Sequence, residues 1–383
     1  MTTVWPAPDA STAAAGPPAP TGTTTTGTTT TGRWPRVQGV DLARALAIGG
    51  MLVAHFVARA DERSVLDSVR AFVDGRAMPL FVLLSGVSVT LLARSARHPD
   101  RALLVRAALF LPLGLALQEW TVGIAIILQY YALFLAVAVG LRRLGDRTLL
   151  ALAAAVTAAA GVTVQLLGPR WPGYEAWRGG HGIVPPWGLL ANLTVNGYYP
   201  MLPAIAFLIV GLWLGRRDLD DTRVAGRLLA VGVALGLVGY VGGRALEARL
   251  ATAGTIGAPA SSDAGPVFVW ARLADAAGHS EMPAWVIGST GTACAALGAC
   301  LLVARRTRRT TAPFVALGQL SLSAYVAQAL VIRWTPAFED TTIAQQSLIA
   351  LALFTGLTLA AWAWRGVARR GPLEALVHAV SRS

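Results

Sequence analysis

The chain of 383 residues has no lysine, only two cysteines and few charged side chains of any kind. Charged residues make up 14% of the sequence, whereas soluble domains carry about 25%. Hydrophobic residues make up 55%, so the composition excludes an ordinary soluble domain and indicates an integral membrane protein. The net charge of +12 could suggest a nucleic-acid partner. We exclude one because the arginines stand in short clusters between apolar runs.

The scarcity of cysteine also excludes several kinds of site. Cys294 and Cys300 fall in one apolar run at a spacing that places them on different faces of a helix. We therefore expect neither a disulfide nor a metal site, and no metal cofactor. The sequence has no glycine-rich phosphate loop and no nucleophile elbow.

Apolar runs long enough to cross a bilayer, about 20 residues each, follow one another from residue 39 onwards. They lie near 39–58, 76–94, 102–118, 121–141, 148–167, 198–215, 224–243, 284–304, 312–332 and 345–364. This pattern predicts an all-α polytopic integral membrane helical bundle with about ten transmembrane helices. Most of the 32 basic residues fall in the loops on one side, which the positive-inside rule assigns to the cytoplasm. We expect a multi-pass protein of the plasma membrane with both termini cytoplasmic.

Composition also divides the chain into three parts. Residues 1–36 are rich in Thr, Ala, Pro and Gly and cannot bury enough apolar surface to fold, which predicts a disordered cytoplasmic tail. Residues 37–368 contain the expected spans. Residues 369–383 form a short cytoplasmic C-terminal tail.

Two ionisable residues, Arg44 and His55, lie inside the first apolar run. An ionisable side chain in lipid is costly, so it marks a functional site by default. Eleven residues make about three helical turns, so the two side chains share one face about 16 Å apart. Arg44 is expected either to hold an anionic group or to form an ion pair with Asp41, three residues earlier. The alternative for His55 is a hydrogen bond between helices.

Several stretches resemble transmembrane acyltransferases. Arg44 and His55 resemble a motif of the acyltransferase-3 family, as does Pro79-Leu-Phe-Val-Leu-Leu-Ser-Gly86. Stretches more like the DUF418 group, which is related to heparan-α-glucosaminide N-acetyltransferase-like proteins, are Ile127-Leu-Gln-Tyr-Tyr-Ala-Leu133, Gly197-Tyr-Tyr-Pro-Met-Leu-Pro203, Gly278-His-Ser-Glu-Met-Pro283 and Leu317-Gly-Gln-Leu-Ser-Leu-Ser-Ala-Tyr325-Val-Ala-Gln328. The resemblance covers roughly residues 37–365.

The resemblance implies transfer of an acyl group, usually acetyl, from cytoplasmic acetyl-CoA to a sugar or other acceptor across the membrane. The lysosomal sugar N-acetyltransferase has its active histidine in the first outer loop, but that loop, about 59–75 here, contains no histidine. The role would therefore fall to His55 or His279. His55 would act as general base or become acylated itself. Arg44, with Asp41 beside it, would hold a phosphate of CoA.

Other polar residues lie in the expected spans or at their ends. His279 either binds the acceptor or serves as an acid–base group, or it is merely solvated. Glu119 either orients a histidine or is a solvated loop carboxylate. Residues that either join helices by hydrogen bonds or donate to a thioester oxyanion are Gln129, Tyr130, Tyr325 and Gln328. Gly86 predicts close helix packing, against the first span.

Two functions from other classes stay open. A transporter or flippase for a small anionic or amphipathic solute would use the same buried arginine and histidine as a relay, without covalent chemistry. A non-catalytic membrane scaffold would have no use for them. The expected partners are membrane lipid and a small-molecule or glycan acceptor, and a homo-oligomer is left open.

Overall fold

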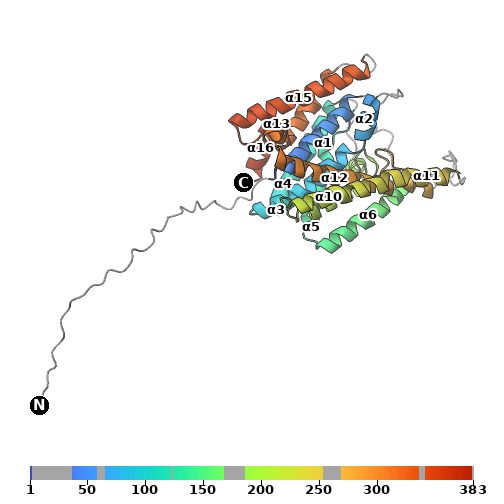
Figure 1. Ribbon diagram of the computed structural model, residues 1–383, viewed down its shortest axis with the longest axis horizontal. Helices are drawn as coiled ribbons and strands as arrows, with labels where there is room; N and C mark the ends of the chain where they lie inside the picture. Colours follow the sequence, from blue (N-terminus) through green and yellow to red (C-terminus); the bar gives the residue numbers. More distant parts are fainter. Residues whose placement is uncertain are drawn as a thin grey trace, which may run out of the picture. The chain divides into compact units, whose positions relative to one another are not determined.

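The computed structural model describes Met1 and residues 37–57, 65–121, 124–167, 186–252, 269–335 and 341–381. Within these ranges every regular element is a helix, which confirms the expected all-α class (Figure 1). The helices belong to one compact unit, Arg36–Ser383. The expected disordered tail falls, apart from Met1, outside the described residues and stays a prediction.

Among the described residues, seven helical segments are long and apolar enough to cross a membrane, by length and composition. They are built from α1 (Gln38–Phe56), α2 (Val65–Val73) with α3 (Ala77–Ser95), α4 (Pro99–Trp120), α6 (Asp146–Leu167), α10 (Thr222–Leu237) with η2 (Val238–Gly242) and α11 (Gly243–Thr252), α12 (Pro283–Arg306) and α15 (Ile343–Val367). An eighth is a bent pair, α13 (Arg308–Gln319) and α14 (Ser321–Val331), with an angle of 72° at the break. The chain is therefore a multi-pass membrane protein.

Two of the ten expected spans are shorter than predicted. These are α5 (Leu128–Leu141) and α9 (Met201–Leu214), of 14 residues each. Before α5 the chain is not helical, and the side chain of Gln118 replaces the missing helical bonds by donating to the Ile124 carbonyl (3.0 Å) and accepting from the Ile126 amide (2.8 Å). Non-helical backbone is tolerated at membrane depth when protein groups satisfy it in this way. Before α9 stand α8 (Pro186–Ala191), the π-helix η1 (Asn192–Asn196) and a bend.

The long helices divide into central and peripheral ones. α1 contacts α3, α12, α13 and α15, while α10 lies along α12. α15 and α6 are the least buried long helices and lie at opposite edges of the bundle in Figure 1.

The close packing expected of Gly86 is present, but its partner is α9 and not the first span. A Cβ at Gly86 would lie 2.2 Å from the carbonyl oxygen of Leu208. A Cβ at Gly211 would lie 2.0 Å from the carbonyl oxygen of Leu83. The two glycines let the backbones of α3 and α9 touch, and a single sequence does not say which neighbour a small residue serves.

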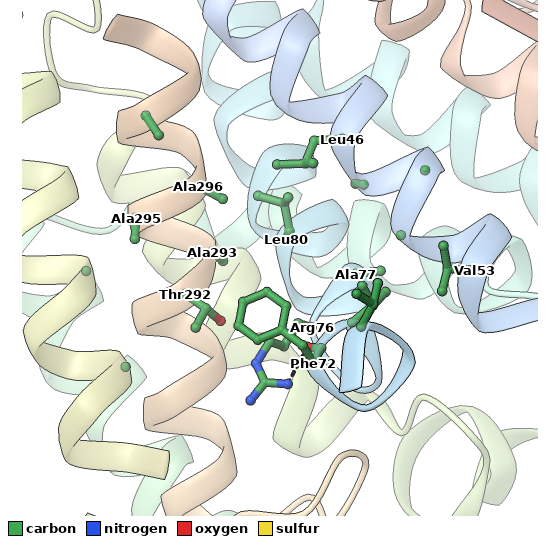
Figure 2. A pocket seen from close by; sticks show the side chains of 18 of the residues that line it. Leu46, Val53, Phe72, Arg76, Ala77, Leu80, Thr292, Ala293, Ala295 and Ala296 are labelled. Carbon is green, nitrogen blue, oxygen red and sulfur yellow. Dashed lines mark hydrogen bonds between the residues drawn. The ribbon is translucent and has the colours of Figure 1, made fainter. Parts of the chain in front are cut away.

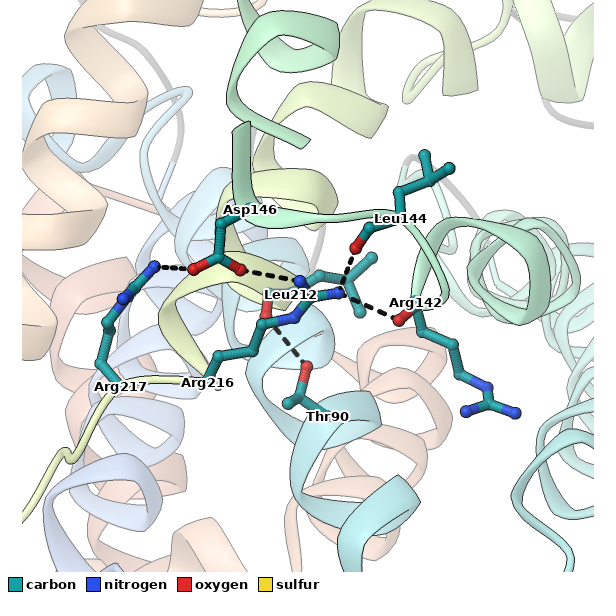
Figure 3. Close-up of polar contacts among 7 residues, drawn as sticks. All are labelled: Thr90, Arg142, Leu144, Asp146, Leu212, Arg216 and Arg217. Carbon is teal, nitrogen blue, oxygen red and sulfur yellow. Dashed lines mark hydrogen bonds and ion pairs between the residues drawn. The ribbon is translucent and has the colours of Figure 1, made fainter. Parts of the chain in front are cut away.

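Ion pairs gather at the end of the bundle where α1 begins, which we call the arginine-rich end. Arg216 Nη1 contacts Asp146 Oδ1 at 2.7 Å, and Nη2 donates to the carbonyls of Arg142 (3.0 Å) and Leu144 (2.7 Å) (Figure 3). Arg217 pairs with the same carboxylate. These contacts join the end of α9 to the turn between α5 and α6. We call the opposite end, where α1 stops and α12 starts, the histidine end.

Candidate functional site

A cavity of about 270 Å³ lies beside Arg44 in the half of the bundle nearer the arginine-rich end. Its polar lining comes from six helices: Arg44, Ser85, Ser88, Tyr131, Gln319, Ser321, Tyr325 and Glu374. We call it the Arg44 cavity. One cation, one carboxylate, several hydroxyls and a helix break around a small space make a site for a polar group.

Arg44 is fixed in this wall by its neighbours. Its guanidinium forms an ion pair with Asp41 and donates to Ser88 Oγ at 2.7 Å. Asp41 is buried and also accepts from Gln319 Nε2 at 3.2 Å. The ion pair expected from the three-residue spacing is therefore confirmed, and Arg44 lines the cavity as well.

The break between α13 and α14 places a helix start at the cavity. The carboxylate of Glu374, on the C-terminal helix α16 (Pro372–Val380), accepts from the amides of Leu322 (2.8 Å) and Ser323 (3.1 Å). It also accepts from the Ser323 hydroxyl at 2.5 Å. The first amides of a helix attract anions, so Glu374 occupies a position that favours negative charge.

Buried tyrosines connect the Arg44 cavity to the histidine end. Tyr131 lines the cavity, and the neighbouring Tyr130 packs edge-on against Tyr199, with ring centroids 5.6 Å apart. Tyr199 in turn lies 5.7 Å from the ring of His279. A Cβ at Gly197 would lie 2.4 Å from the Tyr130 hydroxyl, which explains why the stretch before α9 starts with glycine.

His279 lies in a tight loop directly before α12. Its φ is 61° and that of Glu281 is 60°, a left-handed backbone conformation that residues other than glycine rarely adopt. Such a conformation costs about 1 kcal/mol or more at each position and is concentrated at functional sites. The His279 Nδ1 lies 3.9 Å from Glu281 Oε1, and its ring lies 5.9 Å from that of Trp285.

Glu281 is a buried carboxyl group, with 6% of its surface exposed. Neither carboxyl oxygen has a hydrogen-bond partner in the part of the chain that is described. Burial raises the pKa of Glu281 to about 8, because the charged form loses its hydration. The loop therefore holds a largely neutral carboxylic acid next to an imidazole at neutral pH.

The α2–α3 turn packs against this loop through Gly75. Gly75 has a φ of 69°, and a Cβ there would lie 2.6 Å from Gly278 Cα and 3.1 Å from the His279 amide nitrogen. Asp74 lies beside it, with a carboxylate oxygen 3.2 Å from the Cβ position of Gly278. Asp74, Tyr199, His279, Glu281 and Trp285 together form what we call the histidine cluster.

Arg70 joins the end of α1, the helix that carries His55, to the histidine cluster. Arg70 pairs with Asp74 at 3.0 Å and donates to the carbonyls of Val57 (2.8 Å) and Ala54 (3.3 Å) at the end of α1. His55 lies in the last turn of that helix. Because α1 is continuous, Arg44 and His55 are about 16 Å apart along it, as expected.

The remaining expected residues have mainly structural surroundings. The Tyr325 hydroxyl accepts from the Ile127 amide at 3.0 Å, and Gln129 donates to Gln118 at 3.3 Å. Gln328 is buried, with no partner for either amide atom among the described residues. Glu119 is exposed, which matches the solvated alternative.

Three residues of this region, Arg70, Asp74 and Glu281, are not predicted as site residues from the sequence. Arg70 and Asp74 read as ordinary charges of an outer loop, although their four-residue spacing is that of a helical ion pair. Glu281 could have been found, because it lies two residues from His279 and directly before an apolar run.

Comparison with known proteins gives two adjoining matches. A family model described as heparan-alpha-glucosaminide N-acetyltransferase, catalytic, matches residues 36–247. A model for a group of unknown function, DUF418, matches residues 243–383. No curated protein matches the chain. The histidine cluster takes Asp74 and Tyr199 from the first stretch and His279 and Glu281 from the second. Since the first match covers more than half of the chain, the protein belongs to the heparan-alpha-glucosaminide N-acetyltransferase catalytic family, a family of membrane acetyltransferases.

Proposed function

We propose that the protein transfers an acetyl group from cytoplasmic acetyl-CoA to the amine or hydroxyl of an extracytoplasmic sugar or other small acceptor. The observation that carries this proposal is the histidine cluster, a strained loop that holds His279 next to a buried carboxyl group. Family membership supports the acetyl transfer. The proposal includes acetyl-CoA as the donor, the small acceptor and the roles of the individual residues.

The donor would enter from the arginine-rich end, which the positive-inside rule places in the cytoplasm. Arg44 would bind a phosphate or carbonyl of CoA, because a guanidinium makes paired hydrogen bonds to such oxygens. Asp41 and Ser88 would hold the guanidinium in place. The row of tyrosines marks the direction in which the thioester would extend towards the histidine cluster.

His279 would be the general base, taking the proton from the acceptor as its nitrogen or oxygen bonds to the thioester carbonyl carbon. The carbon–sulfur bond then breaks and CoA leaves as the thiol, so the acceptor's proton ends on sulfur. Glu281, as a neutral acid, would donate a hydrogen bond to the reacting oxygen or to the leaving sulfur. His55 would support the cluster through Arg70 and Asp74. An acyl-histidine intermediate remains the alternative for either histidine.

The test measures release of CoA thiol from acetyl-CoA by the purified protein in lipid nanodiscs, with glucosamine as a soluble acceptor. His279→Ala should lower kcat about 100-fold or more, the usual contribution of general base catalysis. His98→Ala is the matched control, because His98 is exposed at the start of α4. Full activity in His279→Ala together with loss in His55→Ala would transfer the base role to His55.

A second variant separates donor binding from chemistry. Arg44→Gln should raise KM for acetyl-CoA while kcat for bound donor changes less. If Arg44→Gln changed only kcat, the Arg44 cavity would not be the donor site. Uptake of a labelled solute into vesicles without any turnover of acetyl-CoA would support the transporter instead.

A further inference from the structure

A large apolar groove lies on the side of the bundle, separate from the Arg44 cavity. Its volume is about 910 Å³, at the upper end of the range for ligand pockets. Its walls come from α1, α2, α3, α10 with η2, α12 and α15. Figure 2 labels lining residues of α1, α2, α3 and α12. Small residues facing each other keep the groove open, among them Gly49 and Gly50 on α1 and Ala293, Ala296 and Ala299 on α12.

The groove reaches from the middle of the bundle towards the histidine end. Its lining covers residues 46–57 in α1, 229–241 in α10 and η2, 292–299 in α12 and 347–354 in α15. The ranges in α1 and α15 lie in the half of their helix nearer the histidine end, whereas 229–241 and 292–299 lie about the middle of their spans. α15, which forms one wall, is the least buried of the long helices. The groove therefore extends from the middle of the bundle towards the histidine end, between a central and a peripheral helix.

One full charge, Arg76, stands in this apolar lining. Its guanidinium lies 4.0 Å from the ring centroid of Tyr240 and 4.8 Å from that of Phe72. Nη1 donates to the carbonyls of Ala71 and Phe72, and no carboxylate among the described residues lies within ion-pair distance. The buried Nε has no hydrogen-bond partner there either. A cation at the edge of an apolar groove, without a counter-ion from the described chain, attracts an anion.

Arg76 is also next to the histidine cluster. It follows Gly75, whose Cβ position lies 3.0 Å from Trp285 Nε1 and 3.1 Å from the His279 amide. Behind it, the Tyr240 hydroxyl bonds to Ser289 Oγ (2.7 Å), which donates to the Gly75 carbonyl (3.4 Å). The Arg76 backbone is thus one residue from the turn that packs against the His279 loop.

We propose that the groove binds the hydrocarbon chain of a phosphate-bearing membrane lipid, with the phosphate at Arg76, and that this lipid is the acetyl acceptor. The inference rests on the proposed function and narrows its acceptor to an amphipathic molecule of the leaflet at the histidine end. Apolar contact along the groove supplies affinity, and the guanidinium fixes the depth of the head group. The head group's amine or hydroxyl then points over the Gly75 turn towards His279.

Lipid binding is tested by native mass spectrometry of the detergent-purified protein titrated with phosphatidylglycerol and with diacylglycerol, which lacks the phosphate. We expect phosphatidylglycerol to bind at least tenfold more tightly than diacylglycerol. Arg76→Gln should remove that preference and leave the weaker binding of both. Ala296→Trp should abolish the binding of both lipids, because the indole fills the groove. If Ala296→Trp fails to fold, Leu351→Trp on α15 should have the same effect. Val162→Trp, on the exposed face of α6, is the control and should bind as the wild type does. Equal binding by all variants would overturn the inference.

The acceptor role has its own readout. Nanodiscs made from total lipid of the source organism are incubated with radiolabelled acetyl-CoA, and the label is followed into the organic and aqueous phases. Label in the organic phase that Leu351→Trp reduces at least tenfold supports the inference. Label only in the aqueous phase overturns the lipid acceptor while acetyl transfer stands. No transfer to either phase would refute the proposed function, and the binding titration would still decide whether the groove holds lipid.

Discussion

The buried carboxyl group of Glu281 leads to a prediction about stability against pH. Its pKa of about 8 in the folded protein compares with 4.5 for an ordinary glutamate. Between these values the folded state keeps a proton that the unfolded state releases. The contribution of Glu281 to the free energy of unfolding is therefore greatest below pH 4.5 and falls as the pH rises towards 8. One pKa unit corresponds to about 1.4 kcal/mol, so the loss across the window amounts to at most about 5 kcal/mol.

Glu281→Gln removes this dependence. The amide has the shape of the neutral acid and cannot ionise, so we expect the variant and the wild type to have similar melting temperatures at pH 5. At pH 9 the variant should melt several degrees higher, because only the wild type must hold a buried charge. Groups that titrate in both proteins cancel in the difference.

The assay is thermal unfolding of the detergent-solubilised protein at pH 5, 6, 7, 8 and 9. Glu119→Gln serves as the control, because Glu119 is an exposed carboxylate at the histidine end. Its melting temperature should stay within a degree or two of the wild type at every pH. The reasoning fails if the difference between Glu281→Gln and the wild type is the same at pH 5 and pH 9, or if it shrinks as the pH rises.

Three further variants test contacts away from the histidine cluster. Gly86→Ala should destabilise the protein by about 3 kcal/mol or more, because the added methyl meets the backbone of α9, whereas Gly356→Ala meets nothing and should be neutral; thermal unfolding compares them. Glu374→Gln should lower stability by about 1–2 kcal/mol, since a charged acceptor at the start of α14 becomes neutral; a melting temperature equal to the wild type would show that the cap is dispensable. Asp146→Asn breaks a partly exposed ion-pair group and should cost less than about 1 kcal/mol, with KM for acetyl-CoA unchanged; a larger loss would mean that these pairs hold the arginine-rich end together.

Much of the fold could be predicted because a helix that crosses a bilayer needs about 20 predominantly apolar residues. The first span was placed within two residues at its ends, and the Arg44–Asp41 pair follows from a spacing of three residues on a helix. Periodicity could not reveal that α5 and α9 are short. That depends on Gln118 satisfying the backbone before α5, a contact made by the fold and not by the local pattern.

The candidate site was predictable only in part, because some of its residues are defined by contacts between distant parts of the chain. His55 and His279 stood out because ionisable residues are rare near the spans. The burial of Glu281, by contrast, follows from the packing of Gly75 against Gly278, two glycines about 200 residues apart in the chain. From hydropathy alone, Glu281 is predicted to be a solvated loop carboxylate. Its burial depends on contacts in the three-dimensional structure.

The shortness of α5 and α9 changes how far a transferred group must move. A helix of 14 residues rises about 21 Å, whereas the hydrocarbon layer of a bilayer is about 30 Å thick. The two helices contact each other, and non-helical chain precedes both of them on the histidine side. The helical part of the bundle at this place is thus shorter than the hydrocarbon layer by roughly a third. Under the proposed function, a flexible arm shorter than the full bilayer would then carry the acetyl group from the Arg44 cavity to the histidine cluster.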